Sequence, residues 1–168
     1  MTDSGASASG RRASELQQQL EALLARIREA QRQAELARQR ALEAQKRAQE
    51  AQQRAEKAQA LADRTRKAAD VRAAQKAQQD YKLEDARYKK ESAAADMHDK
   101  EVKLLQAKVK QTREQIRSPS HTSSAAADKK VSDAQADFDR ARKTDELSRM
   151  HADWQEAESK AFDSPEDA

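Results

Sequence analysis

Apolar residues recur through residues 16–62 at alternating steps of four and three positions. Leucine and isoleucine hold the first of these positions, and alanine holds nearly all the others. This unbroken heptad pattern predicts a long α-helix with one narrow apolar face. We call this face the alanine seam. Its representative residues are Leu16, Leu20, Leu23, Ile27, Ala34, Ala41, Ala48, Ala55 and Ala62.

The heptad rhythm changes after Ala69, where Ala73, Ala77 and Tyr81 follow one another in steps of four. Such steps are stutters, which shift the apolar face around the helix. A second register with seven-residue spacing then begins at Tyr81. The core residues that it predicts are Tyr81, Tyr88, Val102, Val109 and Ile116, with Leu105 between them.

Helix breakers are almost absent, since no glycine or proline lies between Gly10 and Pro119. The chain therefore predicts one helix of about 100 residues that begins after a cap at Ser14 and ends near residue 117. We expect a turn at 118–124 and a second helix over about 125–163, capped by Ser123 or Ser124. The small, polar ends at 1–12 and 164–168 are predicted to be disordered tails.

The second helix carries its own apolar spacing, which predicts that it folds back antiparallel on the first. Its expected core begins with Val131 and Phe138. After a slip in register near Thr144, it resumes with Leu147, Met150 and Trp154. Residues 78–163 are thus predicted to form an antiparallel helical hairpin. Residues 13–77 are predicted to project from it as an arm without a partner in the chain. The expected fold class is all-α, an elongated coiled coil with one long helix and a shorter return helix.

Composition supports a coiled coil over a globular domain. Charged residues make up 38% of the 168 residues and aromatic residues only 3%, so few large side chains exist to fill a core. No cysteine is present, which removes disulfide and thiolate chemistry. No apolar stretch is long enough to span a bilayer, and the first residues do not resemble a secretory signal. We therefore expect a cytoplasmic location, with export without a cleaved signal as the alternative.

Charge is unevenly distributed along the chain. Residues 11–67 hold 14 basic and 8 acidic residues, whereas residues 118–168 hold 7 and 12. Arginine and glutamine flank the alanine seam, so a parallel homodimer would pair arginine with glutamine. An antiparallel homodimer would place arginines against one another. A parallel dimer through the seam is therefore favoured. Docking of the arm on another protein and a free, unpaired helix are the alternatives.

Residues typical of catalysis or metal binding do not form recognisable patterns. His98, His121 and His151 belong to neither an ExxH pair nor an HExxH motif, and no glycine-rich loop exists to hold phosphate. The basic residues of the arm are interrupted by glutamate, and the arm has no aromatic residue for base stacking. The sequence predicts no enzyme activity, cofactor, metal or small-molecule substrate, and nucleic acid is not the expected partner.

The predicted long helix with a shorter return helix resembles two kinds of protein. One is the coiled-coil stalk proteins of bacterial secretion systems, and the other is the receptor-binding hairpins of colicin-type toxins. The resemblance is architectural and implies a stalk, adaptor or receptor-binding role. Hydrophilic chains rich in alanine, glutamine and lysine also resemble desiccation-protective proteins, although the strict heptads found here differ from their eleven-residue repeats.

These observations predict a non-enzymatic coiled-coil structural or assembly protein that self-associates or docks on a partner through the alanine seam. The first alternative is a secretion-type stalk or adaptor, or a colicin-like receptor-binding hairpin. The second alternative is a desiccation-type protectant.

Overall fold

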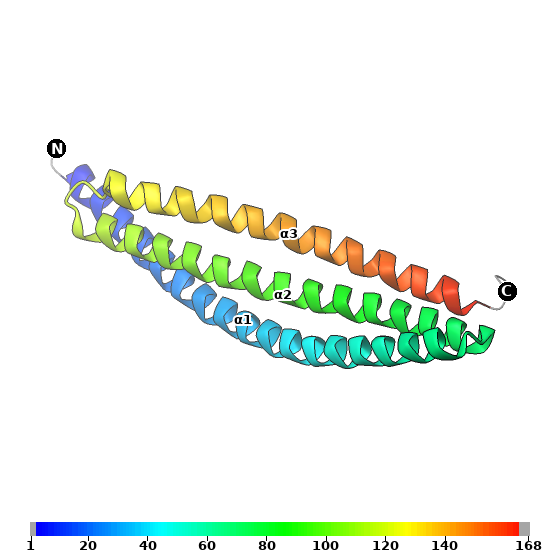
Figure 1. Cartoon of the computed structure of the whole chain (residues 1–168). Coiled ribbons are helices and arrows are strands. Elements are labelled where there is room, and N and C mark those ends of the chain that lie inside the picture. Colours follow the sequence, from blue (N-terminus) through cyan, green and yellow to red (C-terminus); the bar gives the residue numbers. More distant parts are fainter. Residues whose placement is uncertain (1–2, 165–168) are drawn as a thin grey trace. The chain divides into compact units, whose positions relative to one another are not determined.

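The structure is a computed structural model that describes residues 3–164, in which all regular structure is α-helical (Figure 1). Helix α1 spans Asp3–Thr65, α2 spans Ala68–Arg117 and α3 spans Ala125–Asp163. The predicted all-α class is confirmed. The predicted single helix of about 100 residues is wrong, because the chain turns between α1 and α2.

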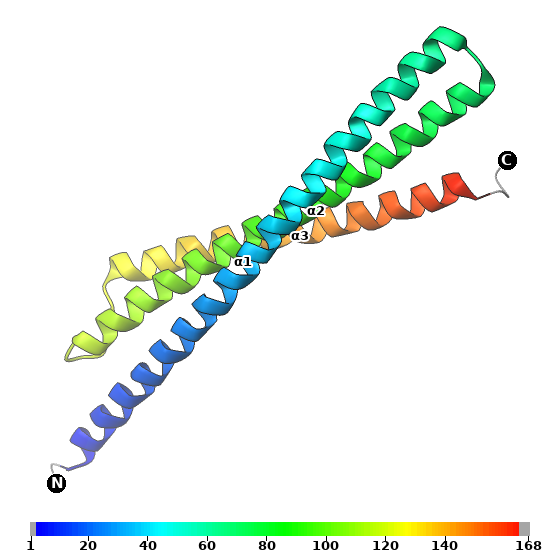
Figure 2. The same cartoon turned by 90° about the horizontal axis from the view of Figure 1, so that it is seen from below.

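The turn between α1 and α2 is formed without glycine or proline (Figure 2). Arg66 adopts a φ of 51°, in the left-handed region, while its amide still donates to the carbonyl of Ala62 at 2.8 Å. This is an αL motif, which ends a helix. The Thr65 hydroxyl donates to the Asp70 carboxylate and accepts from the amide of Lys67. These local hydrogen bonds replace the breaker that the sequence lacks.

The alanine seam explains why the chain turns back here. A continuous helix would leave a row of apolar groups in water. Each group of methylene size that stays exposed forgoes about 0.8 kcal/mol of stabilisation by burial. The turn lets α2 cover the seam instead. Ala44 is fully buried, Ala51 is 1% exposed, and Ala37 forms a cluster with Ala94 and Ala95 of α2.

The chain divides into two compact units, each of which contains a stretch of all three helices. Unit 1 comprises Met1–Ala34 and Asp96–Arg142, and unit 2 comprises Glu35–Ala95 and Lys143–Ala168. In unit 1, Leu23 of α1 lines the same groove as Lys108 of α2, and Gln111 of α2 donates to Asp128 of α3 at 2.8 Å.

Unit 2 shows the same order of contacts. Arg47 of α1 pairs with Glu84 of α2 at 3.5 Å, and Arg87 of α2 lies 3.9 Å from Glu156 of α3. In each unit, α2 therefore contacts both α1 and α3 (Figures 1 and 2). The prediction of an arm over 13–77 without a partner in the chain is wrong, because α2 packs along α1.

The second predicted turn is confirmed, since α2 ends at Arg117 and α3 begins at Ala125. Ser124 caps α3, because its hydroxyl accepts from the amide of Ala127 at 3.1 Å. The amide of Ser124 donates to Glu114, and this hydrogen bond lowers the pKa of the Glu114 carboxyl. Hydrogen bonds from Ser123 and Gln111 likewise lower the pKa of Asp128.

The chain ends differ in part from the predicted tails. Helix α1 begins at Asp3 rather than near Ser14, so residues 3–12 are not a disordered tail. Extending an existing helix orders only one further residue for each hydrogen bond gained, whereas starting a helix orders three. The free-energy cost of extending α1 toward Asp3 is therefore small. Ser9 lies 3.3 Å from the His121 ring in the α2–α3 turn, which adds a contact there. Of the tail predicted at 164–168, residues 165–168 lie outside the described residues.

Arg66→Gly is expected to stabilise the protein. A residue with a Cβ pays about 1–2 kcal/mol in the left-handed region, and glycine avoids this cost but loses more backbone entropy on folding. The net gain should be about 0.5–1 kcal/mol in the free energy of unfolding, measured by urea denaturation. The same change at Arg64, which lies within α1, should destabilise instead. Equal destabilisation at both positions would contradict a turn at Arg66.

Ala44→Leu is expected to destabilise the protein by about 1–3 kcal/mol, because no space remains at a fully buried alanine. Ala60 is exposed on the same helix, so Ala60→Leu is the control and should change stability by less than about 0.5 kcal/mol. Denaturant unfolding gives both values, and sedimentation gives the mass. A more stable Ala44→Leu protein of doubled mass would show that the seam pairs two chains.

Candidate protein-binding surface

The alanine seam lies on the packed face of α1. Leu16, Ala34, Ala48, Ala55 and Ala62 are buried, with relative exposures of 6% or less. The other representative residues are half-buried, and they are Leu20, Leu23, Ile27 and Ala41. The spacing therefore identified the correct face of the helix. Because α2 covers this face, association through the seam would require α1 to separate from α2.

The residues predicted for the hairpin core on α2 and in the first half of α3 are buried or half-buried. Leu105 and Val109 are buried. The half-buried members are Tyr81, Tyr88, Val102, Ile116, Val131 and Phe138. The prediction is wrong for the second half of α3, where Leu147 is 65% exposed, Met150 66% and Trp154 54%.

The cause is that the predicted slip near Thr144 does not occur. Most of the less exposed positions of α3 keep one heptad register along the helix. They are Ala127, Val131, Ala134, Phe138, Ala141, Asp145, Ser148, Ala152, Gln155, Ser159 and Phe162. Each helical residue advances by about 100°, so Leu147 lies about 200° around the axis from Asp145. The apolar residues of this segment therefore lie on the side opposite its buried face.

We define two faces of α3 within unit 2. The inner face comprises Asp145, Ser148, Ala152, Gln155 and Ser159, all buried or half-buried. The outer stripe comprises Leu147, Met150, Trp154, Ala157 and Ala161, all exposed. A helix that packs on one side normally buries its apolar face. This segment does the reverse.

Two side chains of the inner face are incompletely hydrogen-bonded. Asp145 is 5% exposed, and its Oδ2 accepts from Nε of Arg149 at 3.0 Å. Within the described residues, Oδ1 of Asp145 and Oε1 of Gln155 have no hydrogen-bond partner. A buried polar group without a partner costs about 1–3 kcal/mol. The inner face therefore contributes little to holding α3 in place.

Polar contacts at the edges attach this end of α3 to α2. Lys76 pairs with Asp163 at 2.6 Å, and this hydrogen bond is the main cause of the raised pKa of Lys76. The guanidinium of Arg72 lies 5.3 Å from the centre of the Phe162 ring. Exposed ion pairs and cation–π contacts each contribute about 1 kcal/mol or less. The outer stripe thus belongs to a segment that is held mainly by weak, exposed contacts.

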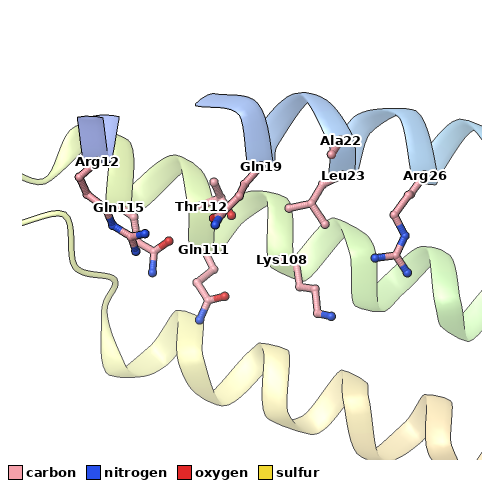
Figure 3. A pocket seen from close by; sticks show the side chains of 9 residues that line it. All are labelled: Arg12, Gln19, Ala22, Leu23, Arg26, Lys108, Gln111, Thr112 and Gln115. Atoms are coloured by element: carbon pink, nitrogen blue, oxygen red, sulfur yellow. The ribbon is translucent and has the colours of Figure 1, made fainter. Parts of the chain in front are cut away.

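A groove in unit 1 is the other notable surface feature. It has a volume of about 410 Å³ and runs between α1 and α2, with Leu23 directed from α1 toward α2 (Figure 3). Its lining residues are basic or uncharged, and its three cations are Arg12, Arg26 and Lys108. An open groove of this kind attracts anions but brings together no acid–base pair for catalysis.

No group of three or more histidine, cysteine, aspartate or glutamate side chains is arranged to hold a metal ion within residues 3–164. In the same part of the chain, no helix is both long and apolar enough to cross a membrane.

No family model matches the chain, and neither a curated protein nor a solved structure is significantly similar to it.

Asp145→Ala is expected to raise the free energy of unfolding by about 1 kcal/mol. The change removes a carboxylate oxygen that is buried without a partner and improves helix propensity. Asp133→Ala, at an exposed site of the same helix, improves propensity alone and is the matched control. Thermal and urea unfolding, followed by circular dichroism, would measure the difference. If the two variants gained equally, burial of Asp145 would carry no cost.

Proposed function

We propose that this chain is a non-enzymatic helical assembly protein that binds another helix through the outer stripe of α3. The observation that carries the proposal is the reversed polarity of α3 in unit 2, where Leu147, Met150 and Trp154 are exposed while Asp145 and Gln155 are buried. Burying the part of each large side chain that is still exposed would contribute about 1–2 kcal/mol, before the costs of association.

The class of function is the one predicted from the sequence, but the proposed contact surface is the outer stripe of α3 and not the alanine seam. The alanine seam is buried in the chain, so docking through it would have to compete with α2. The outer stripe is available without any rearrangement. Its 3–4 spacing matches the ridges by which helices pack against one another, and its two alanines let a partner helix approach closely.

The exposed leucines of α1 support this choice by contrast. Leu36, Leu42 and Leu61 are 43%, 60% and 39% exposed. They are separated by six and nineteen positions, so they form no row along one face of the helix. Isolated exposed apolar residues are common on soluble proteins, whereas a continuous row indicates a contact surface.

Leu147→Glu is expected to abolish assembly while leaving the fold intact, because a charge replaces the apolar contact at a position that the chain itself does not bury. A photo-crosslinking residue at position 150 would report the contact inside cells, with the product identified by mass spectrometry. We expect one defined crosslinked protein, and its loss on Leu147→Glu.

The matched control is Leu42→Glu, which places the same charge at an equally exposed leucine of α1. It should leave the crosslink at position 150 unchanged, and circular dichroism should show equal helix content in both variants. A crosslink that survives Leu147→Glu, or that is lost equally with Leu42→Glu, would contradict binding through the outer stripe.

A further inference from the structure

The geometry of the outer stripe points to a second copy of this chain as its occupant. We propose that two α3 helices pair antiparallel through their outer stripes. The two-fold axis crosses the stripe at the level of residue 152 along the helix. This inference rests on the proposed function and names the partner. It is carried by two features of the stripe, the sizes of its side chains and the charges beside it.

Side-chain size fits an antiparallel pair. In a heptad frame, Leu147 and Trp154 occupy a positions, and Met150 and Ala157 occupy d positions, and antiparallel helices set a against d. Leu147 then faces the partner's Ala157, and Trp154 faces the partner's Met150. Every layer joins a larger with a smaller side chain, which is the alternation that fills an interface without voids. A parallel pair would instead oppose two tryptophans in one layer and two alanines in the next.

Charge favours the same orientation. The g positions beside the stripe are Glu146, Asp153 and Lys160, and antiparallel helices bring g positions together. Glu146 then faces the partner's Lys160, and symmetry gives this pair twice. Lys160 is exposed, and its contact with Glu156 is long at 3.8 Å, so it is available for a new partner. In a parallel pair, Asp153 would face the partner's Glu158, which repels.

Two features limit the affinity. The two Asp153 carboxylates approach each other at the two-fold axis, where like charges are unfavourable. The outer stripe contributes only three large apolar side chains from each chain, which is fewer than a standard interface contains. The expected dimer is therefore weak, in the micromolar range, and reversible with concentration.

The test is a charge exchange read by sedimentation over a range of concentrations. We expect a monomer–dimer equilibrium for the full chain. Glu146→Lys and Lys160→Glu should each weaken it by about tenfold, and the double variant should restore it because the pair is re-formed with opposite signs. Asp153→Asn should tighten it. Glu43→Lys, an exposed charge reversal on α1, is the control and should leave the equilibrium unchanged.

Trp154 is the sole tryptophan, so its quenching by acrylamide reports the stripe directly. It should become protected as the dimer forms. Failure of the double variant to restore dimerisation would overturn the antiparallel pairing. A monomer at every concentration, with Trp154 open to acrylamide, would overturn self-pairing alone, since the stripe would still be free for another protein. A monomer with Trp154 protected would overturn the proposed function as well, because the stripe would then face inward.

Discussion

The small size of alanine is the constraint on which the structure depends. A row of methyl groups contributes useful burial only when another helix lies very close, and few side chains of the alanine seam are large enough to reach a more distant partner. Helix α2 meets this requirement within the same chain, with Ala94 and Ala95 packed at Ala37. The turn at Arg66, although strained in φ, is stabilised because it brings α2 against the seam.

Covering the seam changes which surface is left for association. Had α1 projected freely, its alanine face would have been the natural contact with a partner. With α2 on that face, the largest exposed apolar side chains in a continuous row are those of α3. The alanine seam, which has the smallest side chains, is thus buried within the chain. The two-residue turn keeps α2 close to α1, so this packing needs no association of separate molecules. The outer stripe of α3, which has larger side chains, remains exposed to solvent. A partner that bound there would have to overcome the entropy cost of association.

Heptad spacing predicted much of the fold. The packed face of α1 and the buried Leu105 and Val109 follow from it. The end of α2 and the cap at Ser124 follow instead from the proline and serines after Arg117. The turn at Arg66 could not be predicted from breakers, because an arginine takes the conformation that usually marks a glycine. Its one signal in the sequence is the change of rhythm after Ala69, which is equally typical of stutters within a continuous helix. The apolar register also changes where one helix ends and the next begins. Spacing alone therefore does not distinguish a stutter within a helix from a turn between two helices.

The error in α3 has a different origin, and it exposes the apolar row on which the proposed binding surface rests. The spacing groups Leu147, Met150 and Trp154 in one row, and the usual burial of apolar residues predicts that this row faces the interior. A helix without breakers keeps its register, so the inward face set by Phe138 and Ala141 continues to Asp145 and Gln155. Shifting the register at Thr144 would require local overwinding or unwinding of the helix. The polar inner face and the apolar outer stripe are therefore two results of one uninterrupted helix. The proposed partner on the outer side would cover the apolar side chains that the packing of the chain itself leaves exposed.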